Sequence, residues 1–157
     1  MERLKLYVSF SQEWYDTELP MAENFKYQTE NAAGIDLRAV PGESVVIHPG
    51  QMKKVRTGIS VAIEEDYFGL VAIRSSLGFK HGVTLANGVG VIDSDYRGEL
   101  GLMLVNHGED TVTIEGGERV AQLLILPHSS PLIAYVDDVT KFETERGVGG
   151  FGSTGKF

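Results

Sequence analysis

Apolar and polar residues alternate along much of the chain. Val55, Thr57, Ile59, Val61 and Ile63 are spaced two residues apart, with polar or small residues between them. Successive side chains of a strand point to opposite faces, so this spacing predicts one long strand that is buried on one side. The same reasoning predicts further strands in the apolar or alternating runs 4–8, 45–47, 68–73, 100–105, 111–114 and 120–126.

Turn-forming residues separate these runs, as in Pro41-Gly42, Pro49-Gly50 and Gly116-Gly117. Many short strands joined by turns are typical of a β-sandwich, a jelly roll or a barrel, and we expect an all-β fold. Helical periodicity is scarce. Residues 75–80 are expected to form one short helical turn capped by Ser75, and residues 11–24, which Pro20 interrupts, are expected to be irregular.

Composition and charge narrow the class of protein. The chain has 157 residues, 42% of them apolar, which suits one globular domain, and it has no cysteine. A disulfide scaffold, a cysteine nucleophile and a thiolate zinc site are therefore excluded. The net charge of −8 disfavours nonspecific electrostatic binding to nucleic acid. No apolar run is long enough to span a membrane, and the start lacks the apolar core of a signal peptide, so we expect a cytoplasmic protein without a membrane partner.

The composition changes sharply near the end of the chain. Half of residues 146–155 are glycine, so we divide the chain into a domain over 1–145 and a flexible tail over 146–157. Such a tail can be a frayed terminus. It also offers a cation at Arg146, a stacking ring at Phe151 and hydroxyl donors at Ser153 and Thr154, which suit a flap that closes over a ligand.

Asn87 to Glu99 form a second unusual cluster, which contains Asp93, Asp95 and Tyr96. It could be a simple hairpin turn. It could also be a strand, a tight turn and a returning strand that line a pocket, with carboxylates at the rim. Gly101 fits the pocket, because a glycine within a strand often marks the close approach of a ligand or of another backbone.

Three shorter patterns leave alternatives open. Arg74, Ser75 and Ser76 follow an apolar strand and could form an anion nest or merely a helix cap. Asp36 lies between apolar neighbours and needs a partner, which could be a main-chain N–H, an arginine or a metal-bound water. Gln122 lies in an apolar strand, either as a satisfied core amide or as a residue aimed across an interface.

Together, these clusters resemble the five motifs of the trimeric dUTPase family. The corresponding segments are 33–37, 74–78, 87–99, 117–122 and 146–155, and the third and fifth are long and specific. The resemblance implies a β jelly roll that forms a homotrimer with active sites at subunit interfaces. It implies that the protein uses the cofactor Mg²⁺ and cleaves its substrate, dUTP, to dUMP and pyrophosphate.

The resemblance also implies roles for individual residues. Asp93 would activate the attacking water, and Tyr96 would exclude a ribose 2′-OH. Asn87, with the backbone near Val91, Ile92 and Gly101, would read uracil. Phosphate contacts would come from Arg74, Ser75 and Ser76, and from Gln122 of a neighbouring subunit. The tail residues that would cover the base and clamp the γ-phosphate are Arg146, Phe151, Gly152, Ser153 and Thr154. Asp36 would belong to the metal–water shell or to the architecture of the site.

Two other interpretations fit parts of the pattern. A dCTP deaminase shares this fold and an element like residues 74–77, but its proton-transfer glutamate would fall on Met103, which cannot move a proton. A non-catalytic jelly-roll interaction module fits the strands and the acidity, but it has no use for a nucleotide-shaped set of arginine, aspartate and aromatic residues. Ser76 departs from the family pattern, which usually has glycine there.

Overall fold

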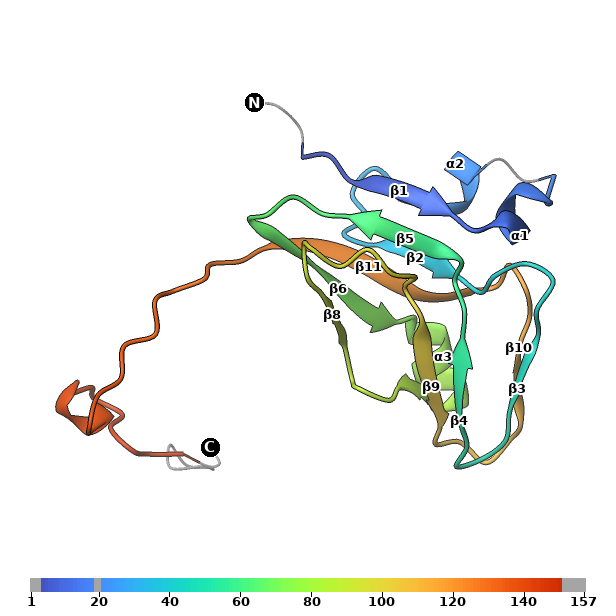
Figure 1. The fold of residues 1–157 in the computed structure, drawn as a ribbon. Coiled ribbons are helices and arrows are strands. Elements are labelled where there is room, and N and C mark those ends of the chain that lie inside the picture. The colour runs from blue at the N-terminus through green and yellow to red at the C-terminus, as the bar shows by residue number, and fades with distance from the viewer. Residues whose placement is uncertain (1–3, 19–20, 151–157) are drawn as a thin grey trace.

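The computed structural model describes residues 4–18 and 21–150, and strands dominate the described part (Figure 1). The expected all-β class is confirmed. The strands are β1 (Tyr7–Phe10), β2 (Ile35–Arg38), β3 (Val45–Ile47), β4 (Met52–Val55), β5 (Ile59–Ala62), β6 (Tyr67–Ile73), β7 (Val83–Leu85), β8 (Gly90–Ile92), β9 (Leu102–Asn106), β10 (Val112–Ile114) and β11 (Arg119–Pro127). No helix of the described residues is long and apolar enough to cross a membrane.

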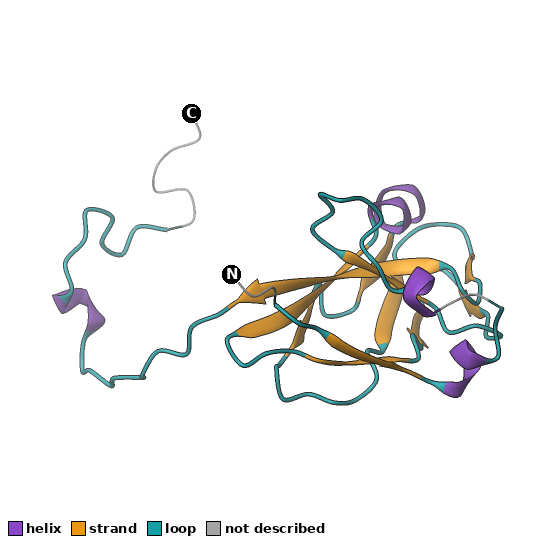
Figure 2. Cartoon of the chain, turned by 90° about the horizontal axis from the view of Figure 1, so that it is seen from above, coloured by secondary structure: helices purple, strands orange, loops and turns teal. Residues whose placement is uncertain are grey.

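The strands form four antiparallel groups that wrap around one core (Figure 2). The largest has the order β2-β11-β6-β8, and a second has the order β4-β9-β7. Strands β1 and β5 form one pair, and β3 and β10 form another. Inward-facing aliphatic side chains from all these groups meet in a single buried cluster, among them Leu37, Ile47, Ile59, Leu104, Ile114 and Leu123.

The alternation that predicted a strand through residues 55–63 correctly identified its buried face, because Val55, Thr57, Ile59, Val61 and Ile63 are all buried. The prediction of one continuous strand was wrong. Strand β4 ends at Val55 and β5 begins at Ile59. Between them, Gly58 has a φ of +64°, a left-handed conformation that interrupts a strand.

The prediction that residues 11–24 are irregular was also wrong. This segment contains two short helices, α1 (Gln12–Tyr15) and α2 (Met21–Asn24). Trp14 in α1 is only 1% exposed, and its indole Nε1 donates a hydrogen bond of 2.7 Å to the Thr57 carbonyl. A buried indole N–H needs such a partner, so α1 is fixed directly over the break between β4 and β5.

Helix α3 (Ser75–His81) is the longest of the described helices and follows β6. The N-cap is Arg74 in an extended conformation, not Ser75 as expected, and it makes no side-chain capping bond. Gly82 ends the helix in a left-handed conformation with a φ of +66°, as is common at a helix C-terminus.

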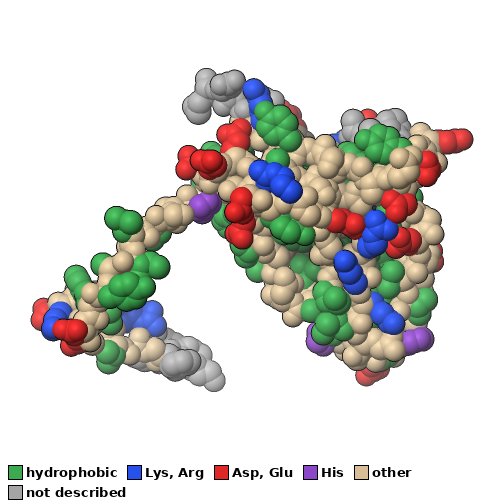
Figure 3. All heavy atoms as spheres, viewed as in Figure 1, with side chains coloured by type: hydrophobic (Ala, Val, Ile, Leu, Met, Phe, Trp, Pro, Cys, Tyr) green, Lys and Arg blue, Asp and Glu red, His purple; other side chains and the backbone are tan. Residues whose placement is uncertain are grey.

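Beyond Pro127 the chain leaves the core as an extended arm, residues 128–150, which carries the short 3-10 helix η1 (Val139–Lys141) (Figures 1 and 2). The arm exposes large apolar side chains, and Figure 3 shows them along its length. They include Leu132, Ile133, Tyr135 and Phe142. The division of the chain at residue 145 stays a prediction, but residues 128–145 are exposed and contribute nothing to this core.

The contact of α1 with Gly58 predicts a sharp difference between two glycines. A Cβ at Gly58 would overlap the Ser11 hydroxyl and lie 2.9 Å from Trp14 Nε1, whereas a Cβ at Gly50 would meet nothing within 4 Å. Both have positive φ. We expect Gly50→Ala to destabilise the fold by about 1 kcal/mol from strain alone, and Gly58→Ala by roughly 1–3 kcal/mol more from overpacking. Thermal melting at equal protein concentration measures both, and equal losses would contradict the packing of α1 against Gly58.

Candidate active site

The pairing of β11 on both of its edges brings together residues that are far apart in the sequence. Gln122 lies opposite Asp36 of β2 on one side and Ala72 of β6 on the other. Arg74 follows β6 directly, and its backbone N–H donates to the Val120 carbonyl. The beginning of β11 therefore collects polar groups from three motifs of one chain.

Asp36 is the centre of this group. It is 9% exposed, and its two carboxylate oxygens face two guanidinium groups: Oδ1 lies 3.6 Å from Arg74 Nε, and Oδ2 lies 3.3 Å from Arg119 Nη1. Arg74 Nη1 also donates to the Arg119 carbonyl at 3.2 Å. Of the partners that the sequence left open for Asp36, the arginine is confirmed, and one carboxylate orients two cations.

Arg38 adds a third cation beside this pair. Its Nη1 donates to the Gly117 carbonyl at 2.8 Å, while its Nε is buried without a hydrogen-bond partner in the described part of the chain. Burial lowers the pKa of Arg38, and the nearby charges of Arg119 and Arg74 lower it further, whereas Asp36 raises it. Two cations thus pair with one carboxylate and a third lies nearby, which leaves a local excess of positive charge in a protein with a net charge of −8.

A cavity of about 360 Å³ opens over this group. Arg74, Ser75, Arg119 and Gln122 line it together, and Gly34 lies so close to Gln122 that a Cβ there would be 2.8 Å from Oε1. Ser76 is half-buried in the same helical turn. The expectation that Gln122 contacts phosphate from a different subunit than Arg74 was wrong, because one chain places both in this cavity. We call it the arginine cavity.

Asn87, Val91, Ile92 and Gly101 line a second cavity of about 310 Å³. Of the two alternatives that the sequence left open here, the simple hairpin is not present: β8 pairs with β6, while the next strand, β9, pairs with β4 and β7. Two consecutive strands that join different sheets diverge, and the cavity lies in the gap between them. We call it the Asn87 cavity. It combines an apolar lining with backbone groups and one amide, a combination that suits a flat heterocycle.

The 93–99 loop joins β8 to the approach to β9 and carries the predicted catalytic carboxylate. Asp93 is exposed and lines a third, open cavity of about 520 Å³, which shares Val91 with the Asn87 cavity. The loop begins as a turn in which Tyr96 N–H donates to the Asp93 carbonyl at 3.1 Å. The Tyr96 ring is 44% exposed, and its hydroxyl donates to the Glu99 carbonyl at 3.1 Å.

The predicted tail residues do not join these cavities within one chain. Arg146 is exposed on the arm, where its Nε donates to the Gly149 carbonyl at 2.7 Å. Phe151, Gly152, Ser153 and Thr154 lie outside the described residues. The residues predicted for one site therefore fall into separate groups: the arginine cavity, the Asn87 cavity with the adjoining 93–99 loop, and the arm.

Comparison with known proteins decides the family. The dUTPase family model matches residues 21–155. The chain belongs to the dUTPase family. It is 47% identical to the deoxyuridine 5'-triphosphate nucleotidohydrolase of Anaeromyxobacter sp. (strain Fw109-5) over 87% of this chain and 90% of that protein. It is also 47% identical to the enzyme of the same name from Nautilia profundicola, over 83% and 89% of the two chains.

Solved dUTPase structures share the fold. Staphylococcus bacteriophage 80alpha dUTPase with dUPNHPP has a TM-score of 0.79 and 27% identity to this chain, covering 97% of it and 99% of the phage chain. A mutant dUTPase from phage phi11 of S. aureus, in which a structural Mg(II) ion is coordinated, has a TM-score of 0.70 at 24% identity and covers 85% and 97% of the two chains. These matches confirm the expected jelly-roll fold of the dUTPases, and they do not favour the deaminase alternative.

Arg38 and Arg119 are the site residues that sequence reasoning missed. Arg119 lies three residues before Gln122. Arg38 lies two residues after Asp36, so Arg38 and Asp36 point to the same face of their strand. A cation spaced in this way from a predicted site residue was the available signal. The strand pairing that brings both arginines next to Arg74 could not be inferred from that spacing.

The shared carboxylate predicts how the arginine cavity responds to anions. Asp36→Asn should destabilise the ligand-free protein by about 1–3 kcal/mol, because two guanidinium groups lose their counter-charge. Pyrophosphate should then raise the melting temperature of this variant by more than it raises that of the wild type. Asp137→Asn, in the exposed arm, is the matched control and should behave as the wild type. An equal pyrophosphate response in Asp36→Asn and wild type would contradict the excess of positive charge.

Proposed function

We propose that this chain hydrolyses dUTP to dUMP and pyrophosphate, with Mg²⁺ and as a homotrimer. The observation that carries the proposal is the arginine cavity, where Arg74 and Arg119 pair with the single carboxylate of Asp36 next to Gln122, and where the charge of Arg38 lies nearby. Such a group has positive charge available for a polyphosphate. The cysteine-free sequence supports our further proposal that the protein works in the cytoplasm.

The separation of the groups supports the homotrimer. In one chain the arginine cavity and the Asn87 cavity share no lining residue, and the arm, which includes Arg146, extends away from the core (Figure 1). The arm also exposes Leu132, Ile133 and Phe142, and exposed apolar surface of this kind marks a contact with another chain. A closed ring of identical subunits can bring the cavity, the loop and the arm of different copies into one site.

The Asn87 cavity fits the base. The side chain of Asn87 and backbone groups near Val91, Ile92 and Gly101 can pair with the polar edge of uracil, and a cytosine would present an amino group where they require an acceptor. In this arrangement the exposed ring of Tyr96 lies against the deoxyribose and leaves no room for a 2′-OH.

The 93–99 loop supplies the chemistry. Asp93 accepts a proton from a water molecule as the water oxygen bonds to the α-phosphorus. The bond from that phosphorus to the bridging oxygen breaks, and pyrophosphate leaves with the bonding electrons. The phosphate contacts of Arg74, Ser75, Ser76 and Gln122 hold the chain of phosphates in line and offset the developing negative charge.

Mg²⁺ fits this set of residues as an ion held mainly by the substrate. The described residues contain no cluster of three or more histidine, cysteine, aspartate or glutamate residues that could hold a metal, and Mg²⁺ is commonly bound through phosphates and water. Its chemical contribution would be to neutralise charge on the triphosphate. Contact between Asp36 and metal-bound water stays a prediction, and its two ion pairs favour the architectural alternative.

The tail completes the site in this proposal. Arg146 adds a cation at the γ-phosphate, Phe151 stacks on uracil, and the Gly152, Ser153 and Thr154 segment supplies donors to the phosphates. Closure of this segment over a bound nucleotide would exclude bulk water from the bond that breaks.

Turnover of four nucleotides tests the function. With Mg²⁺, we expect pyrophosphate release from dUTP, with kcat/KM values for dCTP, dTTP and UTP at least about a hundredfold lower, because lost hydrogen bonds and an obstructed pocket reject each analogue. Ammonia release from dCTP would instead support the deaminase alternative. Absence of turnover with all four nucleotides would support an interaction module.

Asp93→Asn tests the assignment of the catalytic carboxylate. The substitution keeps the shape of the side chain and removes the charge that accepts the proton. We expect nucleotide affinity to stay within about tenfold and kcat to fall by at least about a hundredfold. Asp95→Asn, in the same turn, is the matched control. Near-wild-type kcat in Asp93→Asn would overturn the assignment.

Deletion of residues 146–157 tests the tail. The described part of this segment, residues 146–150, lies outside the core, so we expect the melting temperature to stay unchanged. We expect kcat to fall by at least about a hundredfold, because the γ-phosphate donors and the exclusion of water are lost. Equal kcat at equal melting temperature would show that the tail is only a terminus.

A further inference from the structure

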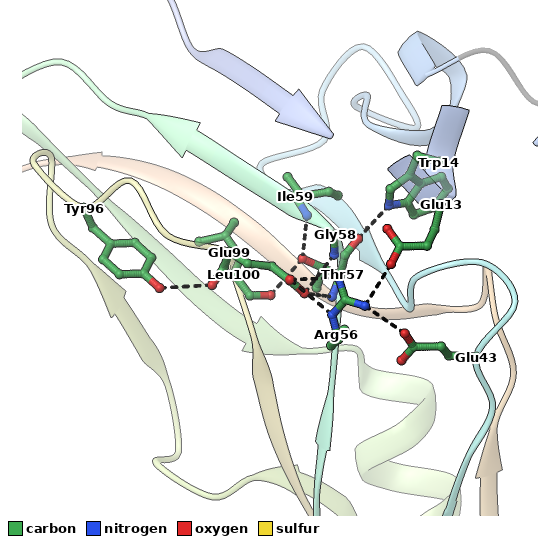
Figure 4. A network of polar contacts seen from close by, with 10 residues as sticks. All are labelled: Glu13, Trp14, Glu43, Arg56, Thr57, Gly58, Ile59, Tyr96, Glu99 and Leu100. Carbon is green, nitrogen blue, oxygen red and sulfur yellow. Dashed lines mark hydrogen bonds and ion pairs between the residues drawn. The ribbon is translucent and has the colours of Figure 1, made fainter. Parts of the chain in front are cut away.

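The Glu99 side chain makes four hydrogen bonds at the end of the 93–99 loop (Figure 4). Its Oε1 accepts from the backbone N–H groups of Thr57 at 3.1 Å and Gly58 at 3.0 Å. Its Oε2 accepts from Arg56 Nε and Nη2, each at 3.2 Å. The side chain is only 30% exposed. Glu99 therefore fastens the loop to the break between β4 and β5.

The backbone around Glu99 strengthens the same attachment. Glu99 bridges to Ser60, Leu100 N–H donates to the Ile59 carbonyl at 2.8 Å, and the buried Thr57 hydroxyl donates to the Leu100 carbonyl at 2.8 Å. The Glu99 carbonyl also accepts the Tyr96 hydroxyl, so the position of Glu99 is transmitted to that ring.

Arg56 is itself held from two other elements. Its Nη1 pairs with Glu13 of α1 at 3.0 Å and with Glu43 at 2.8 Å. The Ser11 hydroxyl, the Glu13 backbone N–H and Arg56 together lower the pKa of Glu13 to about 2. With Trp14 bonded to the Thr57 carbonyl, α1 braces the surface that Glu99 binds.

The hydrogen bonds of residues 93–97 are mostly local in the described structure. The turn bond from Tyr96 N–H to the Asp93 carbonyl and the bonds from Arg97 to the Ser94 and Tyr96 carbonyls all stay within residues 93–97. Asp93, Asp95 and Tyr96 are exposed. The pairing of Ile92 with Gly69 of β6 fixes the loop where it begins, and Glu99 fixes its direction relative to the core where it ends.

We propose that Glu99 is a positioning residue for the proposed reaction: through Arg56 and the Thr57–Gly58 N–H groups it sets where Asp93 and Tyr96 stand. This inference rests on the proposed function for its catalytic consequence. Loss of the Glu99 contacts should impair water activation by Asp93 and also weaken the rejection of a 2′-OH by Tyr96. A purely stabilising contact would not change the preference for dUTP over UTP.

Three full-length variants separate positioning from simple stability. Glu99→Ala removes every side-chain bond. Glu99→Gln keeps an oxygen for the Thr57 and Gly58 N–H groups but loses the charge that faces Arg56. Glu43→Ala is the matched control. It removes one of the two carboxylates that pair with Arg56 Nη1, the other being Glu13, and it leaves the bonds between Arg56 and Glu99 in place. Each is compared with wild type by hydrogen–deuterium exchange and by kcat/KM for dUTP and UTP.

For Glu99→Ala we expect amide exchange in residues 93–101 to rise at least about tenfold, and kcat for dUTP to fall at least about tenfold. The ratio of kcat/KM for dUTP to that for UTP should fall by a similar factor. Glu99→Gln should lie between Glu99→Ala and wild type, and Glu43→Ala should match wild type in all three measurements.

Unchanged exchange in Glu99→Ala, or the same changes in Glu43→Ala, would overturn the inference. So would a lower kcat with an unchanged dUTP-to-UTP ratio, because Tyr96 would then not depend on Glu99. The exchange measurement needs no turnover. If wild type hydrolysed no dUTP, the proposed function would fail, while exchange would still decide whether Glu99 holds the loop.

Discussion

Strand β11 pairs with β2 and β6 at the same time, and this double register determines the arginine cavity. Gln122 must face Asp36 on one side and Ala72 on the other, which places Arg74 and Arg119 at the two oxygens of the Asp36 carboxylate. A one-residue slip of β11 would turn Gln122 to the opposite face and remove Arg119 from Asp36. The charge of the cavity therefore depends on backbone pairing as much as on the arginines themselves.

The chain separates the tasks of a nucleotide site in space. The arginine cavity concentrates cations, whereas the Asn87 cavity is mostly apolar and lies between strands of two different sheets. The 93–99 loop borders the Asn87 cavity and holds Asp93, the carboxylate that we propose to be reactive. Repulsion among Arg38, Arg74 and Arg119 is tolerated because Asp36 offsets part of it. The remaining positive charge is available to a phosphate chain, which arrives with its own negative charge.

The sequence predicted those parts of the fold and of the candidate site that depend on the local pattern of residues. The period of two identified the buried face from Val55 to Ile63, and the motifs identified Asp36, Asn87 and Gln122, which the structure places in the two cavities. The strand break at Gly58 could not be predicted, because it accompanies the approach of Trp14, more than 40 residues earlier. The same holds for Arg38 and Glu99, whose surroundings come from distant strands.

In the homotrimer that we propose, the arginine cavity of one copy works with the 93–99 loop of another. Two inactive variants, Arg74→Ala and Asp93→Asn, can be mixed in equal amounts after dissociation and then reassembled. If the site is shared between subunits, random assembly pairs an intact cavity with an intact loop in about a quarter of sites, and dUTP turnover should return to about a quarter of the wild-type value. Turnover no higher than that of either variant alone would place the whole site within one chain and would rule out a site shared between subunits.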